Sequence, residues 1–103
     1  MVKRIIWTSK AEQIYTEILK FYVHRNGSKT YSKRLNNEVK KLLLLLSNHP
    51  FLGKKTGLTN TRVLIKGNYK IFYKIYTGEL VILLVWDIRQ NPEKLHEFLT
   101  EKK

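Results

Sequence analysis

The chain has 103 residues, of which 43% are hydrophobic and 27% are charged, so it is long enough for one folded domain and too apolar for a disordered segment. Twenty Lys and Arg against eight Asp and Glu give a net charge of +12, which favours a polyanionic or acidic partner. The absence of cysteine excludes disulfides and thiolate metal sites, and the three histidines show no metal-ligand spacing. We therefore expect a single domain spanning residues 1–103, with no metal and no cofactor.

The distribution of hydrophobicity and charge along the chain narrows the class of protein and the kind of partner further. No apolar run approaches the roughly 20 residues that a membrane span requires, and the first apolar segment is too short for a secretory signal, which predicts a cytoplasmic protein without a membrane partner. Residues 19–78 contain thirteen Lys and Arg but a single acid, Glu38. This asymmetry favours nucleic acid, the ribosome or an acidic protein as the partner, and the alternative is a surface that only maintains solubility.

The first half of the chain predicts a strand followed by two helices. Residues 3–8 form a short apolar strand, and Ser9 with Glu12 has the form of a capping box, in which Ser9 accepts a hydrogen bond from the Glu12 N–H. Apolar residues then recur at helical spacing up to an Asn-Gly stop signal at 26–27. A second helix begins at Ser28, and its apolar stripe consists of Leu35, Val39, Leu42, Leu43 and Leu46. The two helices should form an antiparallel hairpin.

Five consecutive leucines at positions 42–46 cannot all lie on one stripe of the second helix. Leu44 or Leu45 must therefore pack against another element or remain exposed to a partner, and we expect them to be part of the core. Residues 47–60 follow as a loop, because a proline and two glycines interrupt the pattern.

Beyond the loop the apolar period changes from 3.6 to 2, which predicts three strands, at residues 62–66, 69–76 and 80–86, joined by hairpin turns. Every second residue from Tyr69 should face the helices, and the third strand is apolar throughout, as in an interior strand. Asn91 can cap a short final helix. The expected fold is α+β: a small antiparallel sheet, in the order strand, helix, helix, three strands, helix, with the helical hairpin on one face.

These elements also carry a recognisable series of short motifs. Pro-x-x-Gly at 50–53, Arg-x-Leu at 62–64, GNYKIFYKI at 67–75 and DIRQNP at 87–92 follow one another in a small basic chain. This arrangement resembles the RelE/ParE superfamily of toxins from bacterial type II toxin-antitoxin modules, over nearly the whole chain. The resemblance implies an acidic antitoxin that binds and neutralises the toxin. It also implies one of two activities, ribosome-dependent mRNA cleavage or inhibition of DNA gyrase without nuclease activity.

RNA cleavage through a 2′-hydroxyl requires cations around the reacting phosphate and groups that transfer protons. Arg62 and Lys66 share one face of their strand, as do Lys70 and Lys74 on the next. If the hairpin register aligns the two pairs, we expect all four in one basic patch on the open side of the sheet. Arg89, just past the last strand, would then clamp a phosphate at the rim of this patch.

The resemblance to the nuclease branch is incomplete. Arg89 and Lys70 stand where that branch has arginines, but its lysine pair has no equivalent near Thr61 and Val63, and its C-terminal tyrosine is replaced by Leu95 or His96. The candidate catalytic residues are Arg62, Lys70, Arg89 and His96, and the candidate RNA contacts are Lys54, Lys55, Lys66, Lys74 and Tyr76.

Each candidate also has a purely structural explanation. Arg62 could pair with Glu79 or Asp87 across the sheet, and the lysines could be ordinary solvated strand residues. The function expected from the sequence is a growth-inhibiting toxin that cleaves mRNA on the ribosome. The alternatives are a gyrase-inhibiting toxin, which the missing lysine pair favours, and a nucleic-acid-binding module without a toxin role, which only the charge supports.

Overall fold

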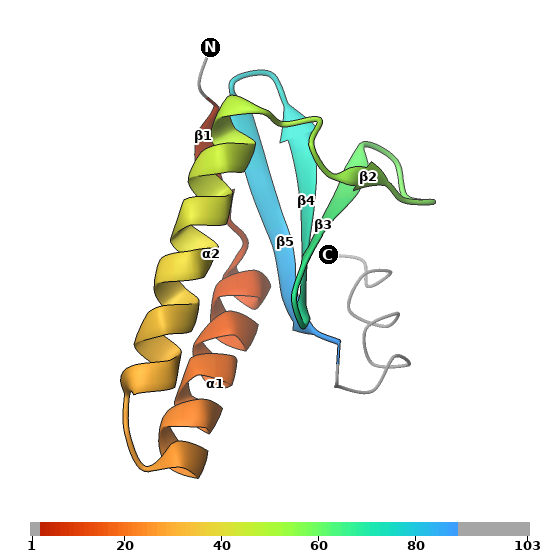
Figure 1. Ribbon diagram of the computed structural model, residues 1–103. Helices are drawn as coiled ribbons and strands as arrows, with labels where there is room; N and C mark the ends of the chain where they lie inside the picture. The colour runs from red at the N-terminus through yellow and green to blue at the C-terminus, as the bar shows by residue number, and fades with distance from the viewer. Residues whose placement is uncertain (1–2, 89–103) are drawn as a thin grey trace.

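The computed structural model describes residues 3–88 and shows two layers, a five-stranded sheet and a hairpin of two long helices (Figure 1). The helices are α1 (Ser9–Asn26) and α2 (Thr30–Asn48), and neither combines the length and apolar character needed to cross a bilayer. The strands are β1 (Arg4–Trp7), β2 (Lys54–Lys55), β3 (Thr61–Lys66), β4 (Tyr69–Tyr76) and β5 (Glu79–Asp87). The expected α+β class is confirmed, and the predicted final helix from Asn91 lies outside the described residues.

The strand order is β1-β5-β4-β3-β2, and its centre is the predicted antiparallel meander of β3, β4 and β5. β5 is an interior strand, as its continuous apolar sequence indicated. β1 pairs with β5 in parallel, with Arg4 opposite Glu79 and Trp7 opposite Ile82, so the sheet is mixed rather than wholly antiparallel. The reason is the path of the chain: the helical hairpin leads away from β1, and the meander then brings β5 back beside β1 in the same direction.

Capping chemistry sets both ends of α1. The cap is Thr8 rather than the predicted Ser9, because the Thr8 hydroxyl accepts the hydrogen bond from the Ala11 N–H at 3.0 Å. At the other end Gly27 adopts a left-handed conformation (φ 68°), and its N–H donates to the Val23 carbonyl at 3.0 Å, which confirms the predicted stop.

α2 begins at Thr30, later than predicted, and runs to Asn48, into the region expected to be a loop. That region also contains β2. This strand was not predicted, because its two residues are both lysines and show no apolar alternation. Most of the predicted apolar stripe is confirmed as buried, namely Leu35, Val39, Leu43 and Leu46. Leu44 and Leu45 are exposed to 64% and 43%, so the expectation that they are part of the core is wrong. They project from the surface of α2 that faces away from the sheet.

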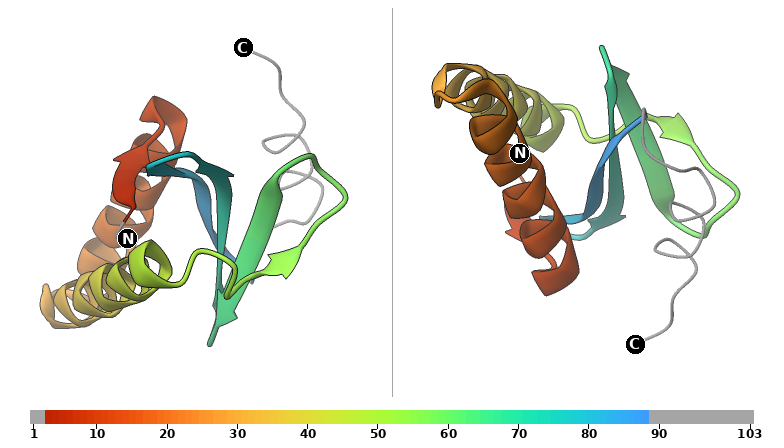
Figure 2. Two further views of the ribbon diagram at one scale, coloured as in Figure 1. Left: turned by 90° about the horizontal axis from the view of Figure 1, so that it is seen from above. Right: turned by 90° about the horizontal axis from the view of Figure 1, so that it is seen from below.

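The two faces of the sheet differ, and both helices lie on the same one (Figure 2). The β4 side chains that pack with the helices in the main core are Tyr69, Ile71, Tyr73 and Ile75, as alternation predicts. On the opposite face Phe72 packs with Leu84 and Trp86 in a second apolar cluster. The centre of this second face is therefore apolar, and lysines occupy its flanks.

A β-bulge in β5 decides which side chains at its end face α1. Leu83 is an extra residue between Ile82 and Leu84, which pair with successive residues of β4. Before the bulge the even-numbered residues face the helices, and after it the odd-numbered ones do. Asp87 is thereby turned towards α1, where its Oδ2 accepts a hydrogen bond from the Tyr22 hydroxyl at 2.9 Å.

Buried tyrosines should make this fold less stable at alkaline pH. Burial raises the pKa of Tyr15 from 10.0 to about 12, and burial together with the hydrogen bond to Tyr31 also raises the pKa of Tyr69. A tyrosine in the unfolded chain ionises near pH 10, so unfolding releases protons above this pH, and the free energy of unfolding falls as the pH rises from about 10 towards 12. We expect the midpoint of thermal unfolding, followed by circular dichroism, to fall across this range and to fall less steeply in Tyr15→Phe. The same slope in both proteins would contradict a contribution from Tyr15.

Candidate nucleic-acid interface and partner pocket

The strand register separates the four basic residues that we expected in one patch. Arg62 and Lys66 lie opposite the tyrosines of β4 that face the helices, and they point to that side of the sheet. Lys70 and Lys74 point to the other side. The expectation of one joined patch is therefore wrong. The relevant signal was present in the sequence, because a two-residue turn pairs residues 66 and 69 directly and so fixes this register.

Arg62 is engaged with the loop that precedes β2. Its Nη1 donates to the Gly53 carbonyl at 2.7 Å and to the Phe51 carbonyl at 3.3 Å, and its guanidinium lies over the Phe51 ring, 5.0 Å from the ring centroid. Glu79, one of the two acids considered as its partner, pairs with Arg4 instead, with 2.6 Å between Nη2 and Oε2. The guanidinium of Arg62 thus holds a loop in place, a role that requires no RNA.

Tyr73 attaches the same loop from β4, directly opposite Arg62. Its hydroxyl donates to the Pro50 carbonyl at 2.8 Å and accepts a hydrogen bond from the Gly53 N–H at 2.8 Å. Burial raises the pKa of Tyr73, so its hydroxyl keeps the proton that it donates. A Cβ on Gly53 would lie 2.5 Å from this hydroxyl oxygen and 2.9 Å from the Val63 carbonyl oxygen, so only glycine permits the contact. The Pro-x-x-Gly and Arg-x-Leu motifs are therefore two halves of one structural attachment.

The remaining candidate RNA contacts within the described residues are dispersed. Lys54 and Lys55 are both exposed on the edge strand β2, where alternation directs them to opposite faces. Lys66 is exposed at the end of β3. Tyr76 is 46% exposed at the end of β4, where its carbonyl accepts a hydrogen bond from the Lys3 ammonium at 2.8 Å. Of the four, Lys54 and Tyr76 share the face of the two β4 lysines.

Arg89 and His96, the other two catalytic candidates, lie outside the described residues, which end at Ile88. The Ile88 N–H donates to the Asn68 carbonyl at 2.8 Å, in the turn between β3 and β4. The preceding Asp87 is buried and bound to Tyr22 of α1, at the end of the sheet remote from Arg62. These bonds fasten the end of β5 to α1 and to the neighbouring turn.

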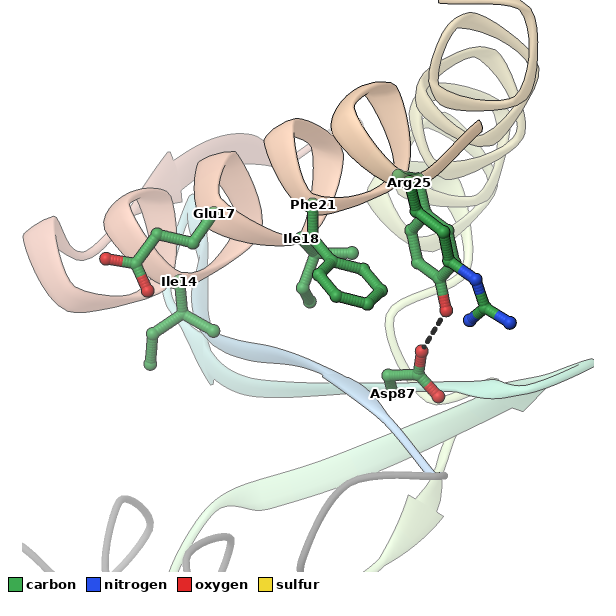
Figure 3. Close-up of a pocket in the computed structure, with 7 residues that line it drawn as sticks. Ile14, Glu17, Ile18, Phe21, Arg25 and Asp87 are labelled. Atoms are coloured by element: carbon green, nitrogen blue, oxygen red, sulfur yellow. Dashed lines mark hydrogen bonds between the residues drawn. The ribbon is translucent and has the colours of Figure 1, made fainter. Parts of the chain in front are cut away.

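A pocket of about 440 Å³ lies between α1 and the end of β5 (Figure 3). It is lined by Ile14, Glu17, Ile18, Phe21, Tyr22, Arg25 and Asp87. Phe21, which is 55% exposed, projects over its apolar wall. None of the candidate residues within residues 3–88 lines this pocket. Phe21 was not predicted from the sequence, because this residue is not among the apolar residues expected on the core face of α1, and it belongs to no motif. Two of its three charged side chains are acidic, so the pocket suits an apolar side chain of a protein better than a phosphate.

Between residues 3 and 88, no three His, Asp or Glu side chains gather closely enough to hold a metal ion.

The family described as the ParE toxin of the type II toxin-antitoxin system parDE has a sequence model that matches residues 5–92. This range includes both helices and all five strands, except for Arg4 at the start of β1. The chain belongs to the ParE toxin family. The resemblance to the RelE/ParE superfamily is thereby confirmed, and this ParE-family chain is a type II toxin, whose partner is an antitoxin.

A solved structure shares the fold of this ParE-family chain. It is the chromosomal ParDE toxin-antitoxin system from P. aeruginosa, which matches with a TM-score of 0.70 over 84% of this chain and 97% of that chain. The two sequences are 16% identical, so the likeness concerns the helical hairpin and the sheet rather than individual site residues. No curated protein matches the chain in sequence.

Proposed function

We propose that this ParE-family toxin arrests growth in the cytoplasm by inhibiting DNA gyrase, and that it has no nuclease activity of its own. The observation that carries the proposal is the dispersal of the basic residues. Arg62 is occupied with loop carbonyls, and Lys66 lies on the opposite face of the sheet from Lys70 and Lys74. A phosphoryl-transfer site needs several cationic groups directed at one phosphate, and the described side chains do not converge in this way.

The character of the exposed surface adds support for a protein target. The pocket beside α1 has an apolar wall, and eight large hydrophobic side chains are exposed within the described residues. Such features are typical of surfaces that bind proteins, whereas RNA is bound mainly through phosphate contacts and stacking. Ribosome-dependent mRNA cleavage is the second candidate, favoured by Lys54, Lys70 and Lys74 on one face and by Arg89 beyond β5.

The two candidates differ in an assay of DNA supercoiling. We expect the purified toxin to inhibit gyrase acting on relaxed plasmid, and prior addition of the antitoxin, the product of the neighbouring open reading frame, to restore supercoiling. In a parallel cell-free translation reaction, mapping of 5′ ends should show an intact reporter mRNA. Unimpaired gyrase, together with new ribosome-dependent cuts that vanish with Arg89→Ala, would instead establish the second candidate and place Arg89 in the cleavage site.

A further inference from the structure

A second pocket, of about 550 Å³, is formed by the loop after α2, by β2 and by the adjoining parts of β3 and β4. We call it the β2 pocket. Its lining includes three apolar side chains, Phe51, Leu58 and Ile75, and two cationic ones, Lys55 and Arg62. The described residues that line it include no Asp or Glu, and the sequence from 39 to 78 contains neither. The β2 pocket therefore combines positive charge with apolar surface, and it shares no residue with the pocket beside α1.

The two cations of the β2 pocket face each other across a strand pair. Lys55 and Arg62 are direct partners in the ladder between β2 and β3. Residues opposite each other on antiparallel strands have Cβ atoms about 5 Å apart on one face of the sheet, so like charges at these positions destabilise the fold. Within residues 3–88, neither side chain forms a salt bridge with an acid. An uncompensated pair of like charges that lines a pocket is typical of a site for an anionic ligand.

The Arg62 guanidinium is fixed in place and still has donors for such a ligand. Its Nη1 binds the carbonyls of Phe51 and Gly53, and the Phe51 ring lies against the guanidinium. Among the hydrogen bonds within residues 3–88, none uses its Nη2 or Nε. A carboxylate can accept two parallel hydrogen bonds from one guanidinium. Because the side chain is already held, little conformational entropy is lost when an anion binds.

The turn between β2 and β3 forms another part of the wall and is also ordered. The Thr56 hydroxyl donates to the Thr61 carbonyl at 3.0 Å and accepts a hydrogen bond from the Leu58 N–H at 3.1 Å. The Asn60 carbonyl accepts a hydrogen bond from the Ile75 N–H at 3.3 Å, which joins the turn to β4. The shape of the β2 pocket is therefore formed before a ligand binds.

The lining indicates which kind of anion the β2 pocket fits. Nucleic acids carry their phosphates between sugars, and proteins contact them through several cations and polar groups. In the β2 pocket, an aromatic ring and two aliphatic side chains border the two cations instead, and the ring, that of Phe51, is 67% exposed. Arginine and aromatic residues together are typical of protein interfaces. The pocket thus fits a carboxylate side chain with apolar neighbours on a protein better than it fits a phosphate.

We propose that the β2 pocket binds an acidic side chain of the protein that the toxin inhibits. The carboxylate lies between the Lys55 ammonium and the Arg62 guanidinium, where its charge offsets their repulsion, and apolar neighbours of this acid pack against Phe51. The inference rests on the proposed function and names the surface through which the toxin contacts gyrase. The antitoxin is the other protein that could supply a carboxylate, and the experiment below separates the two.

The test compares two neighbouring lysines that receive the same substitution. Lys54 and Lys55 are both exposed on β2, but they lie on opposite faces, so Lys54→Glu makes the same change in net charge away from the pocket. In Lys55→Glu, the introduced carboxylate can pair with Arg62 and so occupy the site. The measurement is the toxin concentration that halves supercoiling by gyrase. We expect it to rise at least about 10-fold for Lys55→Glu and to stay within about threefold of the original for Lys54→Glu.

Stability should change in the opposite direction to inhibition. Because Lys55→Glu replaces a pair of like charges by an ion pair, it should unfold at a higher temperature than the original protein, as measured by circular dichroism. Lys54 stands opposite Val63, so Lys54→Glu gains no such pair. A lysine that only supported the fold would lose stability and inhibition together. If Lys55→Glu fails to fold, Lys55→Gln, which removes only the charge, decides the matter in the same supercoiling assay.

Other outcomes would overturn the inference. Equal inhibition by the original and the Lys55→Glu toxin would exclude the pocket as a contact with the target, and equal losses in both variants would mean that only net charge matters. Weaker binding of Lys55→Glu to the protein encoded by the neighbouring open reading frame, with unchanged inhibition, would make the antitoxin the occupant.

An original toxin that leaves gyrase active would refute the proposed function, and growth arrest on expression would then decide the inference separately. The inference stands if Lys55→Glu abolishes the arrest, Lys54→Glu retains it and cellular mRNA stays intact. It falls if the arrest persists in Lys55→Glu, or if the toxin cuts mRNA, since the anion in the pocket would then be a phosphate.

Discussion

Gly53→Val should destabilise the protein by about 3 kcal/mol, whereas Gly57→Val should change the free energy of unfolding by less than about 0.5 kcal/mol. A Cβ on Gly53 would approach the Tyr73 hydroxyl oxygen to 2.5 Å and the Val63 carbonyl oxygen to 2.9 Å. The second of these atoms belongs to the backbone of β3 and is held by the sheet, so it cannot move aside cheaply. A Cβ on Gly57 would meet no atom within 4 Å.

Urea unfolding of the two variants, followed by tryptophan fluorescence, measures this difference. The comparison is well matched because both glycines lie in the same loop and receive the same side chain. Equal stability of the two variants would mean that the loop can move away from β4 at little cost, and the attachment through Arg62 and Tyr73 would then lose its structural importance.

Tyr73→Phe should cost about 2 kcal/mol, because the lost hydroxyl has two partners in a region closed to water. Tyr73 is fully buried, its oxygen accepts from the Gly53 N–H, and its proton is donated to the Pro50 carbonyl. Removing the oxygen leaves both backbone groups without these partners while keeping the aromatic ring in the core. The control is Tyr76→Phe, because the Tyr76 side chain is 46% exposed.

Chemical denaturation gives the stability of both tyrosine variants, and hydrogen exchange at the Gly53 amide gives the local effect. We expect faster exchange of this amide in Tyr73→Phe and no change in Tyr76→Phe. Unchanged stability together with unchanged exchange would contradict the assignment of Tyr73 as the main attachment of the loop.

Local sequence was sufficient for most of the elements, although not for β2, and for much of the fold class. The end of α1 at Gly27, the bounds of β4 at Tyr69 and Tyr76, and the buried stripe of α2 all depend on turn chemistry and short-range periodicity. The opposed positions of Arg62 and Lys70 were also implied by the two-residue turn, although we expected them on one face. The order of the motifs was enough to predict the toxin family.

Long-range contacts were needed for the features that bear on function. Three examples are the parallel pairing of β1 with β5, the bulge at Leu83 that turns Asp87 towards α1, and the binding of Arg62 to loop carbonyls. Each depends on contacts between segments that are distant in the sequence, and local periodicity does not predict such contacts. The exposure of Leu44 follows the same rule, because a leucine is buried only if another element packs on its side of the helix. Periodicity identifies the faces of an element, whereas the packing of the whole chain determines which of those faces remain available to a partner.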